Sequence, residues 1–142
     1  MAIETTPPLL ACGSDQEYID RLRLEYQTKK IIVPEGRTVI FFLNSDKDCM
    51  HFLGGKNSKK INRTRAQHIL FVKYILETTA IRQVKRHIET GNIVFYSEEL
   101  SIVVVCSEMK RGDLHCFTYH PVKSSQKQNF YNQNKYVDFG LN

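Results

Sequence analysis

The sequence has no long hydrophobic segment. Its longest apolar runs, residues 39–43 and 102–106, are the size of a strand, whereas a membrane-spanning helix requires about 20 apolar residues. The first residues also lack the basic segment and apolar core of a secretion signal. We therefore expect a cytoplasmic protein that makes no contact with a membrane.

Cysteine motifs are missing as well. The chain has four cysteines and no CxxC pair: Cys12, Cys49, Cys106 and Cys116. Without a secretion signal, an even number of cysteines is no argument for disulfides, so we expect reduced, mostly buried thiols. Side chains alternate along the predicted strand 114–119, so His115 lies on one face, while Cys116 and His120 lie on the other. No pair of cysteines or histidines has the spacing of a zinc finger. We therefore expect neither a metal nor a cofactor.

What is present fits one domain. The chain has 142 residues, of which 42% are hydrophobic, enough for a core that folds without a disulfide or a metal. Pro7-Pro8 breaks regular structure near the start. Residues 1–13 are therefore predicted to be a flexible tail, and residues 14–142 a single domain.

Apolar spacing and turn residues predict the order of helices and strands. Ser14-Asp15 is typical of a helix start, and Pro34-Glu35-Gly36 is typical of a turn. Helices are predicted at residues 15–27, 46–53, 65–77 and 79–90. Strands are predicted at residues 30–33, 37–43, 93–96, 100–106, 114–119 and 136–139, with a polar loop before the last. This order predicts an α+β fold: an N-terminal helix and hairpin, central helices, and a C-terminal antiparallel sheet of about four strands.

Positive charge is concentrated in the middle of the chain. The net charge is +5, yet residues 56–86 contain nine lysines and arginines and a single acid, Glu77. The helix predicted at residues 79–90 would leave its bases exposed. A segregated basic surface attracts a polyanion such as RNA, although the bases could also form an ordinary solvated helix face. The predicted nucleic-acid-binding residues are Lys59, Lys60, Arg63, Arg65, Arg82, Lys85, Arg86 and Lys123.

Two histidines fit the chemistry of RNA cleavage. Without a metal, cleavage requires a base for the 2′-hydroxyl, an acid for the leaving oxygen and a cation for the phosphate. Histidine fits the first two roles because its pKa is near neutrality. His51 precedes Gly54-Gly55, where a phosphate can approach the backbone, and His120 ends a predicted strand just before Lys123 and Ser124. The alternative for each is a histidine that is merely exposed to water or that caps a helix.

Aromatic side chains near the C-terminus form a third candidate. Phe130, Tyr131 and Tyr136 occur among Gln and Asn residues, a mixture that can stack on bases. The alternative is that they anchor the last strand to the core.

Two short motifs give a resemblance to a known family. The predicted strand 39–43 is followed by His51-Phe52-Leu53-Gly54-Gly55-Lys56, and residues 131–137 read Tyr-Asn-Gln-Asn-Lys-Tyr-Val. In this order they resemble the phage barnase–EndoU–colicin–RelE-like nucleases, over residues 37–140. One feature departs from the family, because residues 120–125 replace an aromatic-rich Ser-Phe-Phe element before the second motif.

The resemblance implies a toxin-like, metal-independent endoribonuclease of phages or mobile elements. His51 and Lys56 match its first motif, and Tyr131 and Gln133 match its second. His51 would act as general base or acid, and Lys56 would bind the scissile phosphate with Arg63 or Arg65. His120 or Tyr131 would be the second proton-transfer group, and Gln133 would position a phosphate or a base.

This hypothesis requires His51 and the segment 131–137 to open onto the same basic cleft. RNA is then the expected partner, with an antitoxin, immunity or host protein as a further possibility. Two alternatives remain: a non-catalytic RNA- or DNA-binding module, and a phage protein that binds and inhibits a host protein.

Overall fold

The computed structural model describes residues 6–27, 29–55 and 60–141. Helices occur at α1 (Asp15–Tyr26), α2 (Asp46–Phe52), α3 (Arg63–Ala66) and α4 (Ile69–Glu77), with 3₁₀ turns at η1 (Thr79–Ile81) and η2 (Ser124–Tyr131). Strands occur at β1 (Ile31–Ile32), β2 (Thr38–Ile40), β3 (Gln83–His87), β4 (Ile93–Ser97), β5 (Ile102–Glu108), β6 (Leu114–Pro121) and β7 (Tyr136–Asp138). The predicted α+β class is confirmed.

Side-chain caps start the first two helices. The Ser14 hydroxyl accepts a hydrogen bond from the Glu17 backbone N–H at α1, and the Ser45 hydroxyl accepts one from the Asp48 N–H at α2. Such caps satisfy N–H groups that have no partner inside the helix. These local signals explain why the predicted helices 15–27 and 46–53 are confirmed. The helix predicted at 65–77 is instead interrupted between α3 and α4.

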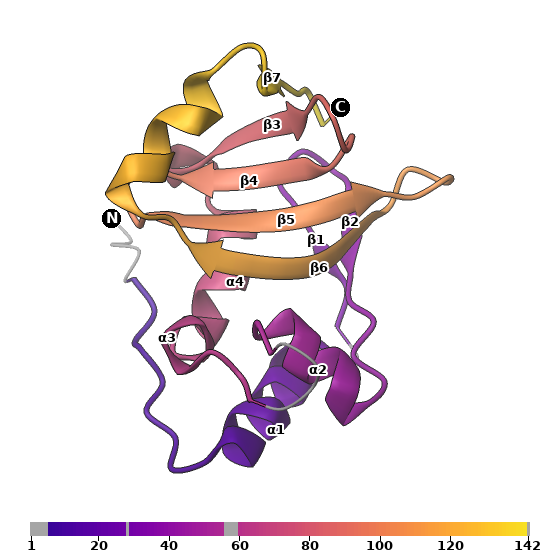
Figure 1. Cartoon of the computed structure of the whole chain (residues 1–142). Helices are drawn as coiled ribbons and strands as arrows, with labels where there is room; N and C mark the ends of the chain where they lie inside the picture. The colour runs from indigo at the N-terminus through magenta and orange to yellow at the C-terminus, as the bar shows by residue number, and fades with distance from the viewer. Residues whose placement is uncertain (1–5, 28, 56–59, 142) are drawn as a thin grey trace, which may run out of the picture.

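The seven strands of the described residues form one mixed sheet in the order β1-β2-β6-β5-β4-β3-β7 (Figure 1). Strands β4, β5 and β6 are antiparallel neighbours, as predicted, and β3 joins them as a further antiparallel strand. The N-terminal hairpin joins the same sheet, because β2 runs parallel to β6, with Val39 opposite Leu114 and Ile40 opposite His115. Beyond this short pairing, the edge of β6 meets helices rather than a strand within the described residues.

The helix predicted at residues 79–90 is wrong. Residues 83–87 form β3, which pairs with β4 on one side and β7 on the other. Gly91, with φ of +75°, lies in the β3–β4 turn, where its N–H donates to the His87 carbonyl at 2.8 Å. Arg82 and Lys85 were predicted to be exposed, but only 9% and 7% of their surfaces are accessible. Pairing with strands distant in sequence decides this segment, and local apolar spacing does not report such pairing.

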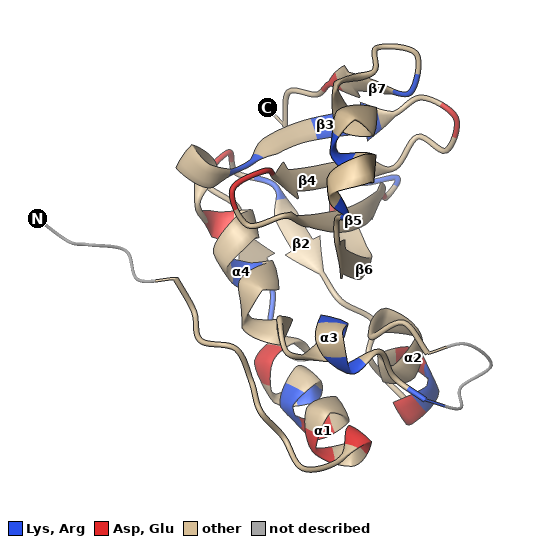
Figure 2. Cartoon of the chain, turned by 60° about the vertical axis from the view of Figure 1, so that its left-hand side comes forward, with Lys and Arg blue, Asp and Glu red and all other residues tan. Residues whose placement is uncertain are grey.

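The two faces of the sheet are covered differently. Helix α4 lies behind the sheet and α1 to α3 lie at its lower side, whereas η2 crosses the opposite face (Figures 1 and 2). The predicted polar loop before β7 is therefore partly a 3₁₀ helix. Phe130 anchors it by stacking on Tyr96, with ring centroids 4.2 Å apart and planes 9° from parallel. We call the face that η2 covers only in part the open face.

A β-bulge in β6 changes which side chains share the open face. Cys106 lies opposite Cys116, but Val105 lies opposite Thr118, so Phe117 is an extra residue. His120 lies opposite Val103 and His115 lies opposite Ser107. Because alternate residues of β5 share a face, both histidines belong to the open face. The prediction that they lie on opposite faces is wrong.

The chain before α1 contacts the domain from Leu10 onward. The Leu10 N–H donates to the Gln67 carbonyl at 2.9 Å, and the Tyr18 hydroxyl donates to the Leu10 carbonyl at 3.3 Å. Residues 1–5 of the predicted tail lie outside the described residues. In the ranges that the structure describes, no helix has the length and apolarity needed to cross a membrane.

Candidate nucleic-acid interface

The edge of β6 brings together side chains from distant parts of the chain. Helix α3 is fixed there by the Tyr119 hydroxyl, which donates to the Arg65 carbonyl at 2.5 Å. The Arg65 side chain then reaches β6, where Nη1 donates to Thr118 Oγ1 at 3.1 Å. As a result, Arg65 lies next to the C-terminal end of β6, which carries His120.

Three potential cations line one hollow at this edge. The hollow has a volume of about 490 Å³, and it is lined by Asn62, Thr64, Arg65, His120, Pro121, Lys123 and Gln126. We call it the cationic hollow. Among the described residues, its lining contains no carboxylate, so the charged groups named here are all of one sign. The side-chain amides of Asn62 and Gln126 and the hydroxyl of Thr64 add neutral hydrogen-bonding groups. Groups of this kind contact phosphate and sugar in nucleic-acid interfaces.

Arg65 is held in this hollow with unused bonding capacity. Burial lowers the pKa of its guanidinium, which remains charged because arginine does not deprotonate in proteins. Its Nε is buried and has no hydrogen-bond partner among the described residues. The side chain also makes no ion pair within the described ranges. Such a cation favours an anionic ligand, because no carboxylate among the described residues neutralises its charge.

The double glycine of the first motif makes room for Arg65. Gly54 has φ of +83°, and a Cβ built there would lie 2.8 Å from Arg65 Cζ. A Cβ on Gly55 would lie 2.8 Å from the Lys60 carbonyl oxygen. Gly55 therefore requires glycine for space, because the crowding atom belongs to the backbone, whereas Gly54 requires it for its conformation, and a Cβ there would displace the Arg65 side chain.

His120 is the titratable group of the cationic hollow. Burial lowers its pKa, and the nearby Arg65 lowers it further, while the Pro121 carbonyl raises it. Nδ1 lies 3.1 Å from the Pro121 carbonyl oxygen, which assigns the proton to Nδ1 and leaves Nε2 as the basic nitrogen. A neutral imidazole at pH 7 can accept a proton when a phosphate binds nearby.

His51 lies in a different hollow. It is exposed on α2, and it lines a space of about 220 Å³ with Asp48, Phe42, His115 and Phe117. We call this space the aromatic hollow, whose lining also includes Leu43, Phe52 and Cys116. Burial lowers the pKa of His115.

Tyr131 and Gln133 line a third hollow of about 550 Å³, with Gln83, Lys85, Phe130, Tyr136, Val137 and Asp138. Helix α2 lies at the lower end of the molecule, whereas β7 lies at the upper end (Figures 1 and 2). Strands β5, β4 and β3 separate β6 from β7. The prediction of one cleft shared by His51 and the late motif is therefore wrong.

Tyr131 is engaged within the protein. Its hydroxyl donates to Glu98 at 3.0 Å, and Lys85 Nζ lies 5.1 Å from its ring centroid. Burial and the hydrogen bond to Glu98 raise the pKa of Tyr131. The phenol is therefore a poor proton donor or acceptor near neutral pH.

Most of the predicted nucleic-acid-binding residues that the structure describes pair with carboxylates. Arg82 forms a bidentate pair with Glu35 at 2.6 and 2.9 Å. The other pairs are Arg63–Asp15 at 2.9 Å, Lys85–Asp138 at 3.0 Å and Arg86–Glu108 at 3.2 Å. Lysines and arginines accordingly occur on α1, α3 and β3 rather than on a single face (Figure 2). Lys56 and Lys59 lie outside the described residues, and Lys60 is exposed.

Some residues of this interface were predicted from the sequence, but their combination was not. Arg65, His120 and Lys123 were each predicted singly, while Asn62, Gln126 and the aromatic group of Phe42, His115 and Phe117 were missed. The apolar run at residues 39–43 and the strand at 114–119 carried the only available signal for that group. The bulge that brings the histidines to one face has no local sequence signal.

Comparisons with known proteins add no support to the family resemblance, which rests on the two short motifs. No family model matches the chain. Searches of curated proteins and of solved structures find no match either. Within the described part of the chain, no group of three or more His, Cys, Asp or Glu side chains is placed to hold a metal ion.

Proposed function

We propose that the chain binds RNA through backbone phosphates in the cationic hollow. The observation that carries the proposal is the convergence of Arg65, His120 and Lys123 on one space whose described lining has no carboxylate. Phosphate contacts supply much of the affinity of a protein for nucleic acid. Asn62 and Gln126 supply neutral groups for phosphate or 2′-hydroxyl oxygens.

Binding without cleavage fits this geometry best. Cleavage by a base and an acid requires two proton-transfer groups on the same phosphate. Among the described residues that line the cationic hollow, His120 is the one imidazole. The other predicted proton-transfer groups, His51 and Tyr131, line two other hollows.

Metal-independent endoribonuclease activity is the second candidate, and the tautomer of His120 favours it. With Nδ1 bonded to the Pro121 carbonyl, Nε2 can accept the proton of a ribose 2′-hydroxyl. The 2′-oxygen would then attack the phosphorus and the P–O5′ bond would break. Arg65 would stabilise the extra charge on the phosphate, and Lys123 would protonate the leaving oxygen.

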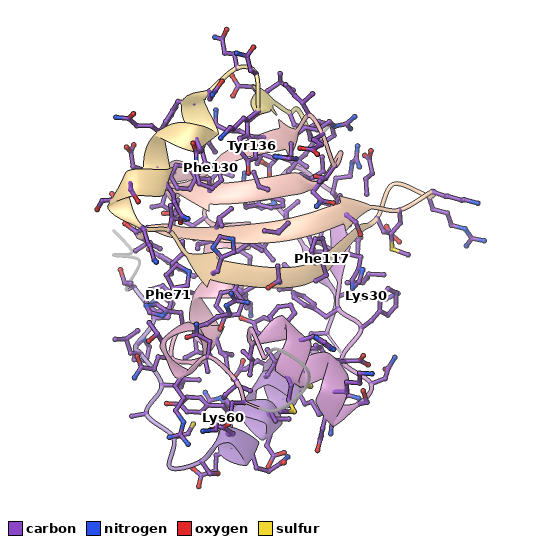
Figure 3. All side chains as sticks on the ribbon, in the orientation of Figure 1. Lys30, Lys60, Phe71, Phe117, Phe130 and Tyr136 are labelled. Carbon is purple, nitrogen blue, oxygen red and sulfur yellow. The ribbon has the colours of Figure 1, made fainter. Side chains whose placement is uncertain are left out.

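The binding experiment uses a fluorescein-labelled 12-nucleotide single-stranded RNA and measures anisotropy at low salt. Lys123→Ala is compared with Lys30→Ala, which removes the same charge from an exposed residue before β1 (Figure 3). We expect Lys123→Ala to weaken binding several-fold and Lys30→Ala to change it little. Equal effects of the two variants, or no binding by the wild type, would contradict the proposal.

Cleavage is measured on the same RNA in EDTA by denaturing gel. Intact RNA with wild-type binding supports a binding module. Shortened products that disappear with His120→Asn, while Lys30→Ala keeps activity, would replace it with the nuclease.

A further inference from the structure

The aromatic hollow presents rings to solvent. Phe42 and Phe117 are 47% and 37% exposed. The His115 ring lies between them, with its centroid 4.6 Å from that of Phe42 and 6.1 Å from that of Phe117. Most large apolar side chains of the described sheet are buried instead. Exposed rings gathered beside one hollow offer a surface on which a flat ligand can stack.

The polar side chains at this hollow fit a planar heterocycle. Leu43 and Phe52 contribute apolar surface, and Asp48 and His51 of α2 add a carboxylate and an imidazole. Both α2 side chains are exposed, so they remain available to a ligand. Nucleobases combine apolar ring faces with edges that donate and accept hydrogen bonds, and proteins bind them by aromatic stacking and edge contacts.

The aromatic and cationic hollows lie along the same strand. His115 lines the first and His120 lines the second, and the bulge puts both on the open face of β6. Five residues of extended chain span about 16 Å, a distance that a few nucleotides of single-stranded RNA cover. Phe117 marks the aromatic hollow beside β6 in Figure 3, away from the pair Phe130 and Tyr136 under η2.

We propose that the aromatic hollow binds a nucleobase of the RNA strand whose phosphate occupies the cationic hollow. The base stacks on Phe42 or Phe117, and Asp48 and His51 contact its edge. This inference rests on the proposed function, since the same RNA strand is held by its phosphates in the cationic hollow at the C-terminal end of β6. The site therefore selects single-stranded RNA with accessible bases over a duplex, in which the bases are stacked and paired.

The test compares two probes of equal length: a 12-nucleotide single-stranded RNA and an abasic ribose-phosphate oligomer. Stacking on one aromatic ring commonly changes affinity by about tenfold. We expect Phe42→Ala to weaken binding of the RNA by about that factor and to leave the abasic oligomer unaffected. Ile88→Ala is the control, because Ile88 is also exposed, at 50%, but lies in the β3–β4 turn.

Equal losses on both probes, or no loss on either, would overturn the base subsite. Wild type that binds both probes equally would overturn it while leaving the phosphate site standing. Wild type that binds neither probe would remove the proposed function itself. A second readout needs no variant: RNA with 2-aminopurine at successive positions should show quenching at one position on binding, and unchanged fluorescence at every position would overturn the stacking.

Discussion

The pair of Arg82 and Glu35 gives the sharpest test of the folded structure. The sequence predicts that Arg82 binds nucleic acid, whereas the structure places it inside the protein. Its side chain is 3% exposed, and it donates to both Glu35 carboxylate oxygens and to the carbonyls of Ile75 and Leu76. Its guanidinium also lies 5.0 Å from the Phe95 ring centroid.

Arg82→Met keeps much of the volume and removes every one of these hydrogen bonds. Breaking a buried ion pair by removing one partner costs about 3–5 kcal/mol, and here two carbonyls at the end of α4 lose a donor as well. Because Glu35 remains partly exposed, water can recover part of its loss, so we expect about 3 kcal/mol. Total stability of a domain is about 5–15 kcal/mol, so the effect is large.

The assay is urea unfolding followed by far-UV circular dichroism, since the chain has no tryptophan. At a slope of about 2 kcal/mol per molar urea, the midpoint should fall by about 1.5 M. Arg111→Met is the control, because Arg111 is exposed in the β5–β6 turn. RNA affinity below the transition should be unchanged. A wild-type midpoint together with weakened RNA binding in Arg82→Met would contradict a buried, stabilising role of Arg82.

Three further predictions concern glycine, a carboxylate and an imidazole. Gly54→Ala should destabilise folding more than Gly36→Ala, because both have positive φ but only Gly54 has Arg65 within 4 Å of a new Cβ; equal urea midpoints would contradict this. The hydrogen bond from its arginine partner lowers the pKa of Glu35, so the stabilisation is present above the unfolded pKa and is lost as pH falls through the folded pKa, and Glu35→Gln should flatten acid unfolding in that range. RNA affinity should rise as pH falls from 7.5 to 6, because phosphate favours the protonated form of His120, and a His120→Asn variant with the same pH dependence would contradict that role.

Local signals were sufficient for much of the fold. Ser14 and Ser45 mark helix starts because each side chain caps a backbone N–H that lies only three residues further along the chain. The β-branched run of β5 forms a central strand, buried on both faces for most of its length. By contrast, β3 resembles a helix in its apolar spacing. Its identity depends on β4 and β7, the second of which lies far along the chain.

The site was beyond sequence analysis for the same reason. Arg65 and His120 are distant in sequence, and an extra residue, Phe117, determines which histidines share a face. The acids that neutralise the basic segment also come from distant elements, as Glu35 does for Arg82. Counting charges within residues 56–86 therefore overstated the basic surface.

We propose that RNA binds at the cationic hollow, and a ¹⁵N-edited NMR titration locates the contact residue by residue. At 16.6 kDa, the chain is small enough for backbone amides to be followed one by one. We predict that adding a 12-nucleotide single-stranded RNA shifts amides of residues 62–65 and 118–126 most strongly. Shifts centred on residues 131–138 or on α1, or no shifts at low salt, would contradict binding at the cationic hollow.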